Sequence, residues 1–124
     1  MNKDNIIDHF KSGIKEPINT KIGVEHEKFL FYKMNNKRIN YSTIKEIFKI
    51  LYEFGWKPSY EGENVIALNK DNKSITLEPG NQIELAGAQL TNIHEVCSEA
   101  NNYLFELKQV VEKLDLKIVS AGFD

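Results

Sequence analysis

Residues 21–33 read KIGVEHEKFLFYK, and this stretch decides the fold. Side chains along a β-strand alternate between two faces. One face would carry Ile22, Val24, His26, Lys28 and Leu30, and the other Gly23, Glu25, Glu27, Phe29 and Phe31. The stretch therefore predicts a strand that is mainly apolar on one side and carries two glutamates on the other.

The sequence on either side of this strand predicts further strands and helices. Helices are expected at 4–13, 43–54 and about 92–114, and strands at 64–69, 73–78, 82–86 and 116–121. Thr43 with Glu46 predicts a capping box at the second helix, and Asn92 with Glu95 predicts a cap for the third. Mixed helices and strands, with short turns between strands, favour an α+β fold: a mainly antiparallel sheet with helices on one face.

Composition predicts an ordinary globular domain. The chain has 124 residues, 41% of them hydrophobic, and a formal net charge of −2. The charge balance favours neither a nucleic acid nor a membrane as partner, and the N-terminus lacks a secretory signal, so we expect a cytoplasmic protein. Cys97, the single cysteine, lies on the apolar stripe of the third predicted helix, where we expect it in the core. Arg38 is the single arginine, so the chain has few groups that could bind a carboxylate or phosphate through bidentate hydrogen bonds.

Four glutamates suggest a metal site. Glu25 and Glu27 lie two residues apart on one strand, so their side chains leave the same face roughly 7 Å apart. Glu78 and Glu84 alternate with apolar neighbours, so they would join the same polar face if their strands pair beside the first. Clustered carboxylates suit Mg²⁺ or Mn²⁺ and point to a phosphoryl-transfer or nucleotide site. The alternative is a solvated strand face without a ligand.

Three blocks of the sequence, taken in order, resemble the glutamate–cysteine ligases of plants and many proteobacteria. They are IGVEHEKF at 22–29, ITLEPGNQIELAGA at 75–88 and IHEVCSEAN at 93–101. Gly122-Phe123 matches the start of the next segment of that family. The resemblance covers about residues 20–124 in one register.

The resemblance implies a glutamine-synthetase-like fold and an ATP-dependent ligase. Such enzymes join the γ-carboxylate of L-glutamate to the amine of L-cysteine through γ-glutamyl phosphate, the first step of glutathione biosynthesis. It also implies that Glu25 and Glu27 match paired Mg²⁺ ligands and that Glu78 and Glu84 match acidic positions of the second block. Gly80 and Gln82 match positions near the substrates. The resemblance assigns no catalytic residue.

Members of that family continue far beyond Phe123, and this affects the expected role of the chain. We expect residues 1–124 to form part of one catalytic domain, the N-terminal portion of a ligase, inactive when isolated. Its partner would be the remainder of the ligase chain or a complementary subunit. Two alternatives stay open: a non-catalytic binding or assembly module derived from the ligase, and a related carboxylate–amine ligase.

Overall fold

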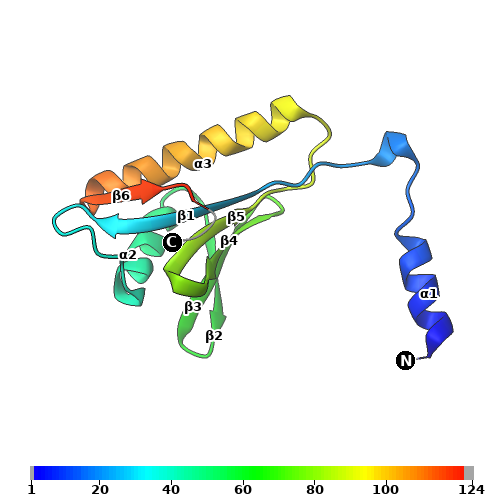
Figure 1. Ribbon diagram of the computed structural model, residues 1–124, viewed down its shortest axis with the longest axis horizontal. Coiled ribbons are helices and arrows are strands. Elements are labelled where there is room, and N and C mark those ends of the chain that lie inside the picture. Colours follow the sequence, from blue (N-terminus) through cyan, green and yellow to red (C-terminus); the bar gives the residue numbers. More distant parts are fainter. Residues whose placement is uncertain (1, 122–124) are drawn as a thin grey trace.

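The computed structural model describes residues 2–121 and places six strands in one sheet (Figure 1). The strands are β1 (Glu25–Tyr32), β2 (Lys57–Glu61), β3 (Asn64–Lys70), β4 (Lys73–Glu78), β5 (Gln82–Ala86) and β6 (Leu116–Val119). The helices are α1 (Lys3–Ser12), α2 (Tyr41–Tyr52) and α3 (Ile93–Lys113), with 3-10 turns η1 (Pro17–Asn19) and η2 (Pro79–Asn81). The strand order is β2-β3-β4-β5-β1-β6, and every pair is antiparallel. The predicted α+β class is confirmed.

The strand β1 joins β6 to the rest of the sheet. Residues 25–28 pair with β5, and residues 29–32 pair with β6. The strand β6, the last one described, lies at an edge of the sheet.

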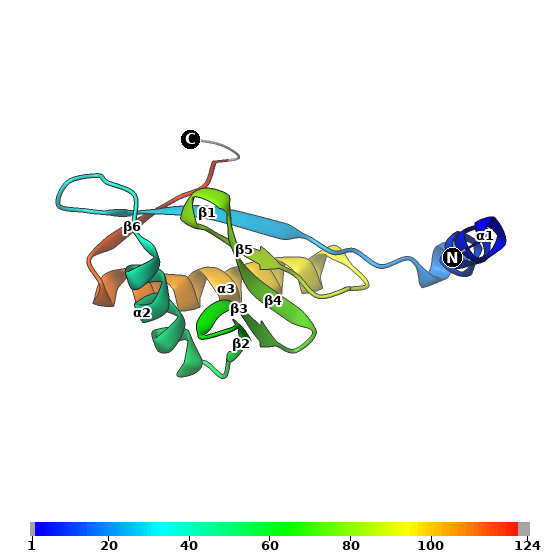
Figure 2. The ribbon, with the colours of Figure 1, turned by 90° about the horizontal axis from the view of Figure 1, so that it is seen from below.

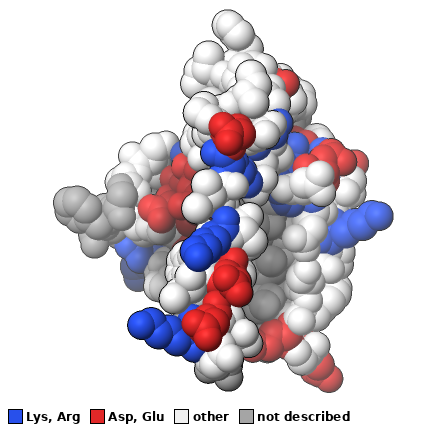
Figure 3. All heavy atoms as spheres, turned by 90° about the vertical axis from the view of Figure 1, so that its right-hand side faces the viewer, with Lys and Arg blue, Asp and Glu red and all other residues white. Residues whose placement is uncertain are grey.

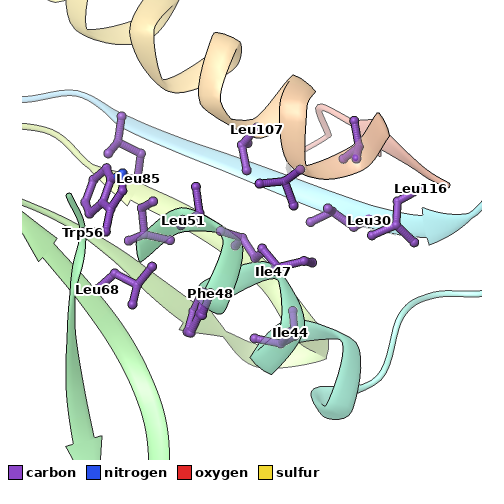
Figure 4. Close-up of a cluster of buried hydrophobic side chains, with 14 of the residues drawn as sticks. Leu30, Ile44, Ile47, Phe48, Leu51, Trp56, Leu68, Leu85, Leu107 and Leu116 are labelled. Atoms are coloured by element: carbon purple, nitrogen blue, oxygen red, sulfur yellow. The ribbon is translucent and has the colours of Figure 1, made fainter. Parts of the chain in front are cut away.

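The hydrophobic core lies between the sheet and two helices. Figure 2 shows α2 and α3 on the same side of β1. Figure 4 shows Leu30 and Leu85 from the strands meeting Phe48 of α2 and Leu107 of α3, and all four are fully buried. Each contributes about 1.5–3 kcal/mol relative to an exposed side chain. Among the residues described, no helix covers the opposite face, which we call the open face (Figures 1 and 2).

The cap of α2 differs from the predicted capping box. Asn40 is the N-cap, and its side-chain oxygen accepts a hydrogen bond from the Thr43 backbone N–H at 3.1 Å. Thr43 lies in the first turn instead, with its hydroxyl 2.6 Å from that of Tyr32. Asparagine is as effective an N-cap as threonine. With Asn40 as the cap, the helix begins earlier than the predicted capping box implies.

At α3 the predicted cap is confirmed, but the buried face is rotated. The Asn92 side chain accepts from the Glu95 N–H at 3.1 Å. Cys97 is exposed, so the prediction that it lies in the core is wrong. The buried positions include two glutamates, Glu99 and Glu106. These carboxylates are buried because they accept hydrogen bonds. A pattern of apolar residues alone does not predict the burial of a glutamate.

Glu106 forms a buried polar network between α3 and the sheet. Its Oε2 accepts from Trp56 Nε1 at 2.6 Å, and its Oε1 accepts from Lys70 Nζ at 2.9 Å. The Glu106 side chain is 11% exposed and the Lys70 side chain 24%. This network ties α3 to the residue before β2 and to the last residue of β3.

The helix α1 lies away from the sheet (Figure 1). It confirms the predicted helix at 4–13 to within one residue, but none of its residues is buried. Ile6, Ile7 and Phe10 are all exposed. None of the helices within residues 2–121 combines the length and hydropathy needed to span a membrane.

The hydroxyl of Tyr103 supplies a test of the core. Tyr103 is 3% exposed, and its hydroxyl has no hydrogen-bond partner among the described residues. Burial raises the pKa of this phenol above its usual value. Because the folded chain leaves a buried donor unpaired, Tyr103→Phe is expected to preserve stability or to raise it by about 1 kcal/mol. Urea denaturation measures the change.

Tyr41→Phe is the matched control for that substitution. The Tyr41 hydroxyl donates to the Val65 carbonyl at 2.9 Å. Its removal is expected to cost about 1 kcal/mol. A loss for Tyr103→Phe as large as that for Tyr41→Phe contradicts an unpaired hydroxyl.

Candidate functional site

Four glutamates share the open face of the sheet. Glu27 on β1 lies directly opposite Glu84 on β5, and Glu84 lies opposite Thr76 on β4. The Cβ atoms of such opposed residues are ~4.5–5.5 Å apart. Glu25 and Glu78 lie two positions along their own strands from Glu27 and Thr76, on the same face. The sheet therefore brings the four carboxylates together as strand alternation predicts, and their role as metal ligands stays a prediction.

We call Glu25, Glu27, Glu78 and Glu84 the acidic group, and the electrostatics within it favour a bound cation. Burial, followed by the charges of Glu78, Glu25 and Glu27, raises the pKa of Glu84 above its usual value. Elsewhere the charge is mixed: Figure 3 shows acidic and basic side chains interspersed over one side of the molecule. The acidic group is thus a local concentration of negative charge, which a cation would relieve.

The donor set fits a particular kind of metal. Among residues 2–121, no three His, Cys, Asp or Glu side chains are arranged closely enough to enclose a metal ion. A closed protein cage of the zinc type therefore does not fit. Magnesium differs, because it is held by one or two carboxylates and completes its shell with water and phosphate oxygens. Glu27 and Glu84, directly opposed, offer such a partial set.

Hydrogen bonds position the C-terminal end of β4. Thr76 Oγ1 donates to Glu78 Oε1 at 3.1 Å, which orients the Glu78 carboxylate. The chain then turns through η2, where Gly80 has φ 75°. A side chain in this left-handed conformation costs about 1–2 kcal/mol, so glycine suits the turn.

Arg38 lies at this turn, 42 residues away in sequence. Its Nη1 donates to the Gly80 carbonyl at 3.0 Å, and its guanidinium lies 4.6 Å from the centre of the Phe29 ring. The sequence reasoning missed this placement. Its only signal was the rarity of arginine in the chain, and rarity carries no spatial information. One guanidinium therefore does stand at the margin of the acidic group.

The two predicted substrate contacts lie on either side of that turn. Gly80 is exposed, whereas Gln82 is 9% exposed and pairs with Glu78 across the β4–β5 turn. Both are next to the acidic group, and their contact with a substrate stays a prediction. Gly122-Phe123, which matched the next segment of the family, lies outside the described residues.

Relatives of the chain are glutamate–cysteine ligases of plants. The chain is 38% identical over 124 residues to the "Glutamate--cysteine ligase, chloroplastic" of Medicago truncatula and 36% identical to that of Nicotiana tabacum. It is 39% identical to "Glutamate--cysteine ligase A, chloroplastic" of Oryza sativa subsp. japonica. Each match covers 99% of this chain but only 24–25% of the relative. The chain thus spans about a quarter of the length of the curated relatives it matches.

These relatives overturn one expectation. Composition and the N-terminal residues led us to expect a cytoplasmic protein, but the matched relatives are named as chloroplastic enzymes. That expectation is wrong. A low cysteine count indicates a reducing environment without telling which compartment provides it.

The match to a protein family covers most of the chain. Residues 21–124 match glutamate-cysteine ligase family 2 (GCS2), and the match includes all four glutamates of the acidic group. The family match begins after α1, whereas the plant relatives match nearly the whole chain. The chain belongs to glutamate-cysteine ligase family 2.

Proposed function

We propose that this chain forms the magnesium-binding part of the active site of a glutamate–cysteine ligase. The observation that carries the proposal is the direct opposition of Glu27 and Glu84 on the open face, with Glu25 and Glu78 beside them. The raised pKa of Glu84 supports it, because a carboxylate crowded by like charges gains from a cation. Family membership supplies the chemistry for which the cation would serve.

The reaction is the ATP-dependent joining of L-glutamate to L-cysteine. The γ-carboxylate of glutamate takes the terminal phosphoryl group of ATP, and the amine of cysteine then displaces phosphate from γ-glutamyl phosphate. The product, γ-glutamylcysteine, is the first intermediate of glutathione biosynthesis. Bound Mg²⁺, or Mn²⁺ in its place, would neutralise charge on the phosphate oxygens.

The described residues would contribute position and charge to that reaction. Glu27 and Glu84 would hold a metal from adjacent strands, and Glu25 and Glu78 would add negative charge beside it. The hydrogen bond from Thr76 keeps the Glu78 carboxylate oriented. Pairing on both sides makes β5 a rigid support, so the carboxylates keep their spacing. The remaining three quarters of a ligase would complete a single glutamine-synthetase-like catalytic domain and supply the other substrate contacts.

Magnesium is expected to stabilise the chain in a pH-dependent way. The raised pKa of Glu84 means that the folded chain holds this proton more tightly than the unfolded chain does. That contribution to stability is present at low pH and is lost as the pH rises through the higher pKa of the folded chain. Mg²⁺ should reverse the loss by binding the ionised carboxylates, so the melting temperature should rise with added MgCl₂ above this pH range and stay unchanged below it. Thermal melts over a pH series measure both trends.

Glu27→Gln should remove the response to magnesium, because it removes one charge at the centre of the acidic group. Glu61→Gln makes the same change at an exposed position on β2 and should leave the response intact. If Mg²⁺ and Mn²⁺ leave the melting temperature unchanged at every pH, the result favours the alternative, a non-catalytic assembly module.

A further inference from the structure

The carboxylate of Glu99 lies between α3 and the backbone that follows β5. Glu99 is 9% exposed, and its Oε2 accepts a hydrogen bond from the Ala88 backbone N–H at 3.1 Å. A Cβ atom on the preceding residue, Gly87, would overlap Glu99 Oε1. The carboxylate therefore occupies the space that a side chain would need at Gly87, and it packs directly against the backbone.

The backbone that Glu99 contacts continues the pairing between β5 and β1. Ala86, the last residue of β5, pairs with Glu25, and the Gly87 N–H donates to the Val24 carbonyl at 2.9 Å. Among residues 2–121, β6 pairs only with residues 29–32 of β1. The segment after β5 is thus the neighbour that holds Glu25 in place within the described structure.

This segment contains an extra residue, which gives Glu99 a role. The next hydrogen bonds between the two segments join Ile22 and Leu90, at 2.7 and 2.8 Å. Residues 88–89 span a stretch that Gly23 alone spans on the other side. An extra residue of this kind is a β-bulge, which interrupts the regular hydrogen bonds of a strand pair. Glu99 accepts the backbone N–H at the bulge that the strand pairing leaves over.

Glu99 lies on the side of the sheet opposite to the acidic group. Gly87 continues the alternation of Leu85, which is fully buried beneath the helices. Glu25 shares the open face with Glu27, two residues along the same strand. The sheet thus separates Glu99 from a metal on the open face, and Glu99 can affect such a metal only through the backbone.

We propose that Glu99 is a positioning residue for the metal site. By holding the Ala88 N–H, it keeps the end of β5 against the start of β1 and so fixes Glu25 beside Glu27. The proposal rests on the proposed function, in which Glu25 adds negative charge beside a metal held by Glu27 and Glu84. Residues that support a metal ligand contribute about 10–100-fold to metal affinity. The lower end applies because Glu25 stands beside the metal.

Glu99→Ala is expected to weaken the affinity of the 124-residue chain for Mg²⁺ about tenfold. The melting temperature as a function of MgCl₂ concentration, at a pH where the acidic group is ionised, gives this affinity. Glu99→Gln loses the charge but keeps an oxygen acceptor for the Ala88 N–H, so it should retain the parental affinity. Glu99→Asp keeps the charge but is one methylene too short, and it decides the matter if Glu99→Ala does not fold.

Tyr41→Phe is the control for loss of stability alone. It removes the core hydrogen bond from Tyr41 to the Val65 carbonyl, which joins α2 to β3. It should lower the melting temperature without changing the affinity for Mg²⁺. A merely structural role of Glu99 would make Glu99→Ala behave in the same way.

Amide hydrogen exchange in metal-free buffer tests the effect on the backbone separately. Glu99→Ala should speed the exchange of the Gly87 N–H, which donates to Val24, and Glu99→Gln should leave it slow. Unchanged exchange in Glu99→Ala would show that Glu99 does not hold this segment.

Three results of the Mg²⁺ titrations overturn the positioning role. Parental affinity in Glu99→Ala would do so and would leave the proposed function standing. Equal weakening by Glu99→Gln and Glu99→Ala would assign the effect to charge instead of the hydrogen bond. A parent chain that does not respond to Mg²⁺ would reject the proposed function and the positioning role together.

Discussion

Glu27→Ala is expected to lower the rate of γ-glutamylcysteine formation more than about a hundredfold in an active ligase that carries this chain. Removing even a group that only orients a metal ligand costs about 10–100-fold, and Glu27 is placed to be a ligand itself. Its loss would leave Glu84 without the carboxylate directly opposite. A suitable enzyme is a chimaera in which residues 1–124 replace the matching quarter of the Medicago truncatula ligase. Product formation from ATP, glutamate and cysteine, measured against Mg²⁺ concentration, gives the result.

The matched control in the chimaera is Glu61→Ala, a loss of the same charge at the exposed edge strand β2. It should keep near-parental activity. Partial rescue of the Glu27 variant by excess Mg²⁺ would place the defect in metal binding. A Glu27→Ala chimaera as active as its Glu61→Ala counterpart would reject the metal role of the open face.

Glu106→Leu is expected to destabilise the fold by about 3 kcal/mol. The substitution keeps a side chain of similar size but leaves Trp56 Nε1 buried without an acceptor and Lys70 without its ion pair. Breaking a buried pair costs ~3–5 kcal/mol, and the lower end applies because Lys70 can turn toward solvent. Chemical denaturation monitored by Trp56 fluorescence reports the loss at the site itself.

Two further variants separate the loss of the acceptor for Trp56 from the loss of charge, and both from the effect of a Glu→Leu change as such. Glu106→Gln retains an acceptor for Trp56 and loses only the charge, so it should cost less than Glu106→Leu. Glu112→Leu makes the same change on the exposed side of α3 and should stay within about 0.5 kcal/mol of the parent. Equal effects of Glu106→Leu and Glu112→Leu would show that the network contributes nothing.

How far the sequence predicts the fold depends on the element. β1 was predicted because alternation along an eight-residue strand is a strong local signal. β2 was missed because Pro58 argues against a strand. The structure places β2 at the edge of the sheet, where a proline is tolerated. The face of α3 was misjudged for a different reason: a buried Glu106 becomes reasonable only once Trp56 and Lys70 are known to lie beside it.

The candidate site likewise has one part that the sequence predicts and another that only the structure shows. Glu25 and Glu27 share a face by strand geometry alone, and a sequence shows that directly. Glu84 facing Glu27 depends on β5 lying beside β1, although 57 positions separate the two residues. The contact of Arg38 with Gly80 depends likewise on segments that are distant in the sequence. No local pattern in the sequence predicts contacts between distant segments, so these features needed the structure.

The pairing of β1 has a consequence for how the chain folds as it is made. Phe29 pairs with Val119, roughly 90 residues later, and at ~5–20 residues per second a ribosome needs roughly 5–20 s to supply that partner. Meanwhile the β3–β4 hairpin can close at once, because its partners are neighbours in sequence. The strand β1 is therefore synthesised early, and its second half, residues 29–32, finds its partner β6 late. Residues 25–28 meet their β5 partners once Ala86 has been made, whereas the edge of residues 29–32 that β6 later covers stays open throughout that interval, available to the backbone of a neighbouring chain.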